Sequence, residues 1–325
     1  MELNPDLYTV AWIAPLEIEA KAALFMLDNR HQGLFTWSPG HDYLFHAGDI
    51  VGHNVIIATL PAGQECTTSS AAALASQIKI IFLNIRFGLL VGVASGIPNL
   101  SKTPPCDIRL GDVLVALPDG ESAGIVAYQL GKETKYGFQL LHGGHMLPRT
   151  ETIIRSAIGK IKIEAPDDAD MFLPFYRSMQ DKSHENGIFL DPGQDRDKLY
   201  AIYEDGVERA VNRKQRPDSE RTRVWYGPLG SGDNLMENGE KRNELRNKYN
   251  IIGLETGAAG TMNQIPVGVI RGVCDYGDER KNKEWQPYAS AMAAAYAKAV
   301  LYEILPRRGI THPIFTSRSD SGISV

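Results

Sequence analysis

Polar residues stand at the ends of apolar segments at several places in this sequence. They are Glu19, Ser95, Ser231, Asp233, Glu255 and Asp275. Open α/β sheets place their ligand sites at the carboxyl ends of their strands, so these side chains are the candidates for chemistry. Asp275 follows the apolar run VIRGVC. A carboxylate that closes an apolar strand is partly desolvated, which raises its pKa and suits it to donate a proton.

Each of these residues also has an ordinary structural explanation. Glu19 lies in the first turn of an expected helix, where an acidic residue commonly interacts with the helix dipole. Asp275 precedes Tyr-Gly, a setting in which an aspartate often forms an Asx-turn. For Ser95 we favour a hydrogen bond within its own turn.

The elements that would position these residues alternate between strand and helix. YTVAWIA, residues 8–14, predicts a buried strand, and the apolar periodicity of 16–27 predicts a helix after it. The same unit recurs as the strand 54–60, a helix that starts at Thr67 and the strand 85–93. This alternation predicts an α/β sheet with helices on both faces.

The second half of the chain continues the pattern. Further strands are expected at DVLVAL from Asp112, AGIVAYQL from Ala123, VWYGPLGSG, IIGLE and VGVIRGVCDY. Further helices are expected at 151–163, 240–249, TGAAGTMNQI and 287–305.

One segment, 165–221, breaks this pattern because it is charged and rich in turn formers. It lacks the apolar mass for a core of its own, so we interpret it as an insertion or lid on the same domain. The sequence therefore predicts a single domain over 1–305, with an insertion at about 165–221 and a loose C-terminal tail at 306–325.

Composition excludes several classes of protein. The 325 residues include 34 Lys and Arg against 39 Asp and Glu, a net charge of −5, and 43% are hydrophobic. This balance argues against a disordered chain and against wrapping nucleic acid. The three cysteines are widely spaced and form no metal-ligand pattern, which favours a reducing, cytoplasmic location. We find no secretory signal and no apolar run long enough to span a membrane, and expect a small-molecule substrate with neither a metal nor a cofactor.

Taken together, several motifs occur in a specific order: PLEIEA, LPAG with TTS, IRFGLLVGVASGIP, DIRLGDVLVA, YGPLGSGD, LETGAAG and VIRGVCDYGDERKNKEWQPYAS. In this order the chain resembles the nucleoside phosphorylase and nucleosidase superfamily from Tyr8 to about Leu305. It is most similar to the branch of filamentous fungi, which is often fused to NACHT or ankyrin modules. The resemblance implies a three-layer α/β fold, a central mixed and partly barrel-like sheet, and cleavage of a purine N-glycosidic bond.

The resemblance also assigns roles to individual residues. Glu19 matches the carboxylate that activates the attacking water, and Asp275 matches the acid that protonates the purine N7 or hydrogen-bonds to it. An oxocarbenium-like transition state needs such an acid on the leaving group and a base on the water. The implied substrate-binding positions are Gly92, Val93, Ser95, Ser231, Asp233, Leu235, Glu255, Thr256 and Gly257. Among these, the glycines of GVASG match a turn that places backbone N–H groups beside the nucleophile.

Two departures from the family pattern bear on the reaction. Phosphorylases bring arginines to phosphate from the two glycine loops, but here those loops read IAPLEIEAKA and GLLVGVASG, without arginine. Arg86 lies at the start of its strand, which favours a solvated charge. Without bidentate phosphate ligands, water is the favoured nucleophile.

The second departure is in the sugar site. The family typically has Glu-Met-Glu-Ala after IIGL, and its second Glu binds the ribose hydroxyls. This chain has Glu255-Thr256-Gly257-Ala258, so a glycine stands in place of that carboxylate. Three explanations are open: a different or deoxygenated sugar, Glu255 reaching in from its neighbouring position, or another ligand altogether.

These observations lead to three hypotheses. The first is a purine nucleoside hydrolase with Asp275 as acid and Glu19 as base. The second is a repurposed enzyme of fungal secondary metabolism on the same scaffold, a cyclase, isomerase or addition catalyst, which an apolar cavity extending past Gly257 would favour. The third is a catalytically silent ligand-binding module. The resemblance further implies a homo-oligomer.

Other conspicuous residues have structural explanations. We expect the histidines to lie at the surface or in turns: His41, His46, His53, His142 and His145. Trp285 and Tyr288 are expected to pack or cap the last helix, and Cys274 to be a small buried residue. Phe172, Phe175 and Tyr176 are aromatic residues of the insertion that either dock it onto the core, which is simpler, or close over a pocket.

Overall fold

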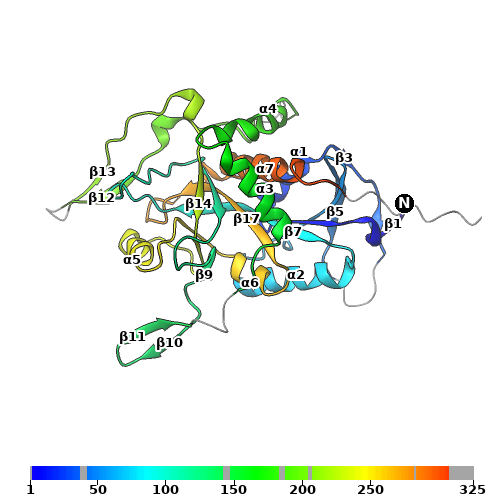
Figure 1. Cartoon of the computed structure of the whole chain (residues 1–325), viewed down its shortest axis with the longest axis horizontal. Coiled ribbons are helices and arrows are strands. Elements are labelled where there is room, and N and C mark those ends of the chain that lie inside the picture. Colours follow the sequence, from blue (N-terminus) through cyan, green and yellow to red (C-terminus); the bar gives the residue numbers. More distant parts are fainter. Residues whose placement is uncertain are drawn as a thin grey trace, which may run out of the picture.

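The fold of this chain is a mixed α/β sheet between layers of helices. It is seen in a computed structural model that describes residues 2–36, 42–141, 147–182, 187–203, 207–281 and 283–306. Figure 1 shows helices α1 (Glu17–Met26) and α7 (Gln286–Tyr302) on one side of the sheet, and α2 (Thr68–Ile81) and α6 (Ala258–Met262) on the other. The α/β fold class expected from the alternating pattern is therefore confirmed.

An 11-stranded sheet lies at the centre of the described residues. Its strands are β2 (Val10–Ile13), β3 (Asn29–Arg30), β5 (Phe45–Ile50), β6 (His53–Ala58), β7 (Phe87–Gly96), β8 (Val113–Ala116), β9 (Ile125–Ala127), β14 (Val224–Gly227), β15 (Leu229–Ser231), β16 (Gly253–Glu255) and β17 (Val267–Asp275). Eight of them run in the order β14-β8-β17-β7-β2-β6-β5-β3, while β9, β15 and β16 branch from this row. The sheet is mixed, since β17 pairs with β7 in parallel and with β8 antiparallel.

Strands β7 and β17 form the centre of the sheet, and nearly all of their residues are buried. Burial on both faces explains why their sequences are almost continuously apolar. Helix α7 covers one face, and its alanines allow it to pack against β17, β7 and α1. The parallel strands β2, β7 and β17 all deliver their carboxyl ends to the same edge of the sheet.

Three further helices and four short 3₁₀ turns occur among the described residues. They are α3 (Thr152–Ile163), α4 (Leu173–Lys182) and α5 (Gly239–Tyr249), with short 3₁₀ turns at Pro5–Leu7, Asp167–Met171, Gln194–Arg196 and Asp218–Glu220. Among the described residues, no helix is both long and apolar enough to cross a membrane.

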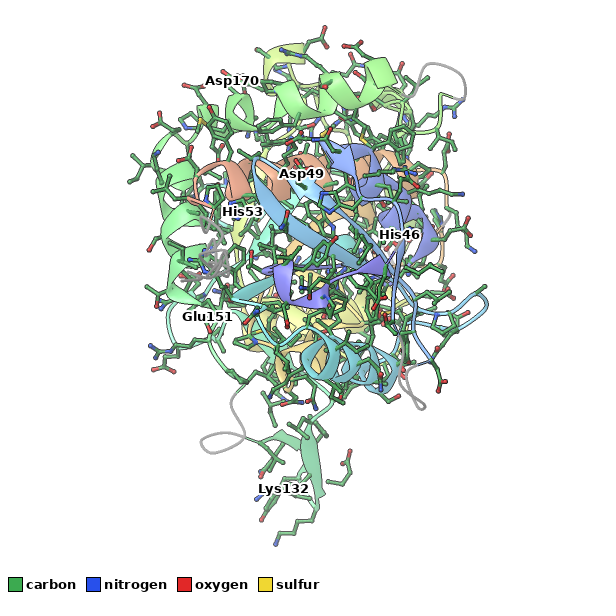
Figure 2. The ribbon with its side chains drawn as sticks, turned by 90° about the vertical axis from the view of Figure 1, so that its right-hand side faces the viewer. His46, Asp49, His53, Lys132, Glu151 and Asp170 are labelled. Carbon is green, nitrogen blue, oxygen red and sulfur yellow. The ribbon has the colours of Figure 1, made fainter. Side chains whose placement is uncertain are left out.

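Three two-stranded sheets lie outside the main sheet. They pair β1 (Glu2–Leu3) with β4 (Leu34–Phe35), β10 (Gly131–Thr134) with β11 (Gly137–Leu140), and β12 (Tyr200–Ile202) with β13 (Glu208–Ala210). The β10–β11 hairpin projects from the body of the protein, with Lys132 directed away from it (Figure 2). The sequence pattern did not predict this hairpin.

The predicted insertion, 165–221, packs onto the core through its aromatic residues. The Phe172 and Tyr296 rings contact edge to face at 5.7 Å between centroids, and the Tyr176 and Tyr288 rings at 5.6 Å. Phe175 contacts Tyr302 in the same layer. These rings therefore dock the segment onto α7, as the simpler explanation predicted.

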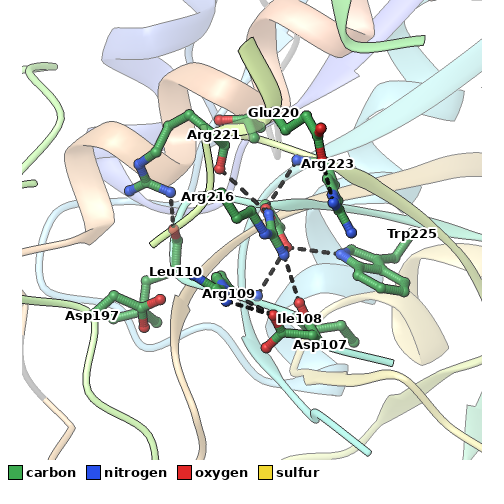
Figure 3. A network of polar contacts seen from close by, with 12 residues as sticks. Asp107, Ile108, Arg109, Leu110, Asp197, Arg216, Glu220, Arg221, Arg223 and Trp225 are labelled. Carbon is green, nitrogen blue, oxygen red and sulfur yellow. Dashed lines mark hydrogen bonds and ion pairs between the residues drawn. The ribbon is translucent and has the colours of Figure 1, made fainter. Parts of the chain in front are cut away.

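An ion-pair network anchors the end of the same segment (Figure 3). The fully buried Asp112 carboxylate accepts two hydrogen bonds from Arg216, at 2.7 and 3.0 Å, and a third from Trp225 Nε1 at 2.8 Å. A buried carboxylate needs such compensation, because it has lost its hydration. The network joins the insertion to the loop before β8.

Two local predictions about the glycine motif are wrong. Strand β7 runs from Phe87 to Gly96, so GVASG is part of an extended strand and not a turn after it. Ser95 does not bond within its own turn: its hydroxyl donates to Asp275.

The expectation of a surface location also fails for His53. This residue is buried, and its Nε2 lies 2.9 Å from the Ile304 carbonyl oxygen.

Candidate active site

A cavity of about 650 Å³ opens where β7, β16 and β17 end beside the start of α1. A volume of this order is typical of small-molecule sites. Its walls come from residues 15–19, 21, 65–66, 93–95, 234–237, 254–256, 271, 274–275, 281, 283 and 286. Of the predicted site residues, the cavity brings together Glu19, Val93, Ser95, Leu235, Glu255, Thr256 and Asp275.

The remaining predicted residues support these walls without lining the cavity. The buried Ser231 hydroxyl accepts the Ala259 N–H at 2.9 Å, which fixes the start of α6. Asp233 accepts the Thr68 N–H at 2.5 Å at the start of α2. Gly92 lies directly behind the Glu19 carboxylate, and Gly257 lies beside Cys66 and Arg271.

Glu19 lies in the first turn of α1 and is 4% exposed. Its Oε2 accepts the N–H of Leu16 at 2.9 Å, and its Oε1 accepts the N–H of Val93 at 2.8 Å. The first bond caps the helix, and the second ties the carboxylate to β7. Glu19 therefore has both its ordinary capping role and a fixed place in the cavity wall.

Gly92 makes this close approach of Glu19 to β7 possible. A Cβ at Gly92 would lie 1.9 Å from Glu19 Oε1 and 2.6 Å from an Arg271 nitrogen. These distances are far below van der Waals contact. The glycine is needed here for space beside the carboxylate.

Arg271 is a cavity residue that the sequence analysis missed. It lies in β17, its side chain is 3% exposed, and its Nη2 donates to Glu255 at 2.5 Å. Its Nη1 lies 3.7 Å from Glu19 Oε1. An arginine inside the apolar run VIRGVC was a usable signal, because an arginine is rarely buried without a partner.

Burial and the neighbouring charges act in opposite directions on Glu19. Burial raises the pKa of the Glu19 carboxyl, while the Arg271 guanidinium and two backbone N–H groups lower it; the net shift is upward. A carboxylate with a raised pKa is a better proton acceptor once ionised. This setting suits a general base.

Both oxygens of Glu255 are engaged within the protein, and its side chain is 1% exposed. Its two oxygens accept the N–H groups of Gly257 and Ala258, and Oε2 also accepts from Arg271. The carboxylate thus caps α6 and neutralises Arg271. This arrangement is evidence against the possibility that Glu255 reaches in to replace the missing sugar-binding carboxylate.

The space beside Gly257 is occupied by polar side chains. A Cβ at this position would lie 3.4 Å from Cys66 Sγ and 3.5 Å from Arg271 Nη2, which is ordinary contact. Burial, with the negative charge of Glu19, raises the pKa of the Cys66 thiol to about 12. Cys66 is therefore a neutral, weakly polar part of the wall and not a nucleophile.

Asp275 ends β17 and is held by donors on both oxygens. Oδ1 accepts from the Ser95 hydroxyl and from the Gly277 N–H, the latter at 2.8 Å. Oδ2 lies 3.5 Å from Lys281 Nζ. The bond to Gly277 is an Asx-turn, so the ordinary role of Asp275 coexists with its place in the cavity.

The other conspicuous residues lie as structural explanations predict, where the structure describes them. Trp285 is 2% exposed and packs on Tyr288, Cys274 is buried, and His46 is exposed. His41, His142, His145 and the tail 307–325 lie outside the described residues. The parts of the chain that are described hold no group of three His, Cys, Asp or Glu side chains suited to a metal ion.

The cavity therefore combines a buried, ionisable carboxylate held by Arg271 with a second carboxylate held by Ser95 and Lys281. The first can accept a proton from a water molecule, and the second can direct a proton toward a leaving group. The described part of the insertion contributes no side chain to the cavity wall, so a lid stays a prediction.

Comparison with solved structures identifies the fold. The chain is similar to 5′-methylthioadenosine/S-adenosylhomocysteine nucleosidase from Neisseria meningitidis in complex with methylthio-immucillin-A, with a TM-score of 0.59 and 16% identity; the match covers 92% of this chain and 100% of that one. It is also similar to futalosine hydrolase of Helicobacter pylori strain 26695, with a TM-score of 0.55, 14% identity and coverage of 92% and 99%. At these identities the likeness establishes the fold alone.

Comparison of sequences gives a longer relative. The chain is 34% identical over 321 residues to a nucleotide-binding leucine-rich repeat (NLR)-like protein of Hyaloscypha variabilis, which covers 96% of this chain. The chain spans 31% of the length of that relative. No family model matches the sequence.

Proposed function

Because the chain has the fold of the nucleoside phosphorylase and nucleosidase superfamily, we propose that it cleaves the N-glycosidic bond of a purine nucleoside with water as the nucleophile. One observation carries the proposal. Glu19 and Asp275, to which the resemblance assigns the roles of base and acid, line the same cavity, and hydrogen bonds fix each of them.

In this mechanism the two carboxylates act at opposite ends of the breaking bond. Glu19 accepts a proton from the attacking water, whose oxygen bonds to the anomeric carbon of the sugar. Asp275 donates a proton or a hydrogen bond to the purine as the bond between carbon and base nitrogen breaks. Both steps stabilise an oxocarbenium-like transition state, and each is expected to contribute about 10²–10⁴-fold to the rate.

The charges around Glu19 support water over phosphate. Arg271 is the one arginine among the described cavity residues, and it already binds Glu255 and faces Glu19. A phosphate at this place would meet two carboxylates and an arginine that is already paired. A neutral water meets no such repulsion.

Gly257 favours a second candidate, a repurposed enzyme that acts on a different substrate. Gly257 carries no carboxylate for a sugar diol, and the oxygens of the neighbouring Glu255 already accept backbone N–H groups of α6 and the Arg271 guanidinium. The nearby wall carries the polar residues Glu19, Arg271 and Thr256, and such a lining does not suit an apolar substrate. This polar lining supports the nucleoside hydrolase over the repurposed enzyme. The presence of both Glu19 and Asp275 in the cavity wall supports it over a silent module.

A nucleoside panel tests the proposal. The protein is incubated with ribonucleosides and 2′-deoxyribonucleosides of adenine and hypoxanthine, with and without phosphate, and free base is measured by chromatography. Hydrolysis predicts free base at a rate independent of phosphate, and release that is about 10²–10⁴-fold slower in Glu19→Gln and in Asp275→Asn. Release that requires phosphate would contradict water as the nucleophile, and no release at high protein concentration would contradict the function.

We also propose, from the resemblance, a cytoplasmic homo-oligomer. Light scattering on the purified protein measures its oligomeric state, and fractionation of the source cells measures its location.

A further inference from the structure

We infer that Asp197 and Arg213, both in the insertion, clamp Tyr276 and thereby fix the orientation of the Asp275 carboxylate in the cavity. The three residues are positioning residues, since none of them lines the cavity in the described structure. Their effect on catalysis rests on the proposed function, whereas their effect on the turn at Asp275 does not.

The clamp consists of buried hydrogen bonds around one phenol. The Tyr276 hydroxyl donates to Asp197 Oδ1 at 2.5 Å and accepts from Arg213 Nη2 at 2.9 Å. Arg213 Nη2 also donates to Asp197 Oδ1 at 2.9 Å, and the guanidinium carbon lies 5.3 Å from the centre of the Tyr276 ring. Tyr276 is 3% exposed, and the side chains of Asp197 and Arg213 are 4% and 7% exposed.

Burial keeps the phenol neutral. Burial first, and then the charge of Asp197, raises the pKa of Tyr276 well above its usual value. A neutral hydroxyl can donate to the carboxylate of Asp197 and accept from Arg213 at the same time. Hydrogen bonds to charged groups are the stronger ones, and here they are shielded from water.

The backbone passes the effect of the clamp to Asp275. Tyr276 lies between Asp275 and Gly277 in the chain. The N–H of Gly277 donates to Asp275 Oδ1. Gly277 has a φ of 62°, the left-handed conformation that favours glycine, so the turn has one specific geometry. The Tyr276 carbonyl is held as well, by Arg242 Nη1 at 2.6 Å. A shift of Tyr276 would therefore move the N–H that orients the carboxylate.

The clamp is itself tied to the core of the protein. Arg213 Nη1 lies 3.3 Å from Asp107 Oδ1 and 3.3 Å from the Ile108 carbonyl oxygen. The insertion thus reaches the active site indirectly, through the residue that follows Asp275.

The test removes a single hydroxyl. Tyr276→Phe should lower kcat about tenfold with little change in KM, because the acid is misaligned while the cavity wall is intact. In an Asp275→Asn background, Tyr276→Phe should lower kcat no further, since its effect passes through Asp275. Equal losses in both backgrounds would overturn the inference. Tyr296→Phe, which removes another buried hydroxyl, bonded to Tyr226, is the matched control and should keep the wild-type kcat.

A second measurement does not depend on turnover. Amide hydrogen exchange at Gly277 should be at least about tenfold faster in Tyr276→Phe than in the wild type, because Asp275 Oδ1 is its acceptor. Faster exchange in a protein that cleaves no nucleoside would support the clamp and refute only the proposed function. Unchanged exchange together with unchanged kcat would refute the clamp.

Discussion

Gly92→Ala is the substitution whose consequence follows most directly from the geometry. The new Cβ would lie 1.9 Å from Glu19 Oε1 and 2.3 Å from Glu19 Cδ. Carbon and oxygen need about 3.5 Å, so the carboxylate must retreat by about 1.6 Å. It cannot do so and keep both its hydrogen bonds, to Leu16 and to Val93.

The expected loss can be estimated from this displacement. A misplacement of about 1 Å costs about 10²-fold in rate, which corresponds to about 2.7 kcal/mol. Each lost hydrogen bond to the carboxylate should lower the free energy of unfolding by about 1.5–3 kcal/mol. We therefore expect Gly92→Ala to release base at least about 100-fold more slowly and to unfold at a lower urea concentration.

The assay measures kcat/KM for base release and the urea midpoint of the same preparations. Gly159→Ala is the matched control: Gly159 lies in helix α3, a Cβ there meets nothing within 4 Å, and alanine favours a helix by about 0.5–1 kcal/mol. This control should keep wild-type activity and lose no stability. Wild-type activity in Gly92→Ala would refute the role assigned to Glu19.

Three further predictions concern other parts of the account. Asp275→Asn keeps an oxygen to accept from Ser95 and Gly277 but cannot donate as an acid, so kcat/KM should fall about 10²–10⁴-fold in the base-release assay; a fall below tenfold would contradict its role. Because burial raises the pKa of Glu19, kcat/KM should fall with decreasing pH at a midpoint above the value of about 4.3 for an exposed glutamate, and a pH–rate profile with a midpoint at or below that value would contradict this. Asp112→Ala leaves Arg216 buried without its carboxylate, so urea denaturation should show a free energy of unfolding lower by about 3–5 kcal/mol; a change under about 1 kcal/mol would mean that the network does not anchor the insertion.

The sequence predicted the elements of the fold where apolar periodicity was strong. Strand β17 and helix α7 lie close to their predicted ranges, because nearly all their residues are buried. The extent of β7 was misjudged, since GVASG, with two glycines and a serine in five positions, resembles a turn. Only the neighbouring side chains reveal that Gly92 is needed for space beside Glu19.

The site was predictable in its residue types and less so in its contacts. The sequence and its resemblance brought forward Glu19 and Asp275, which line one cavity. The partners that fix them were missed. Arg271 is distant in the chain from Glu19, and the contact of Lys281 with Asp275 cannot be predicted from their spacing. The engagement of Glu255 with α6 and Arg271 likewise depends on the three-dimensional arrangement.

The central claim is that water attacks the sugar carbon in the cavity of Glu19 and Asp275. Its most direct test is a short reaction in water enriched in oxygen-18, without phosphate, in which the sugar product is reduced at once with borohydride, before its anomeric oxygen exchanges with the solvent, and is then analysed by mass spectrometry. We predict one labelled oxygen in the sugar for each purine base released, and at least about 100-fold slower formation of this product with Glu19→Gln. Absence of labelled sugar from every nucleoside supplied would contradict the account.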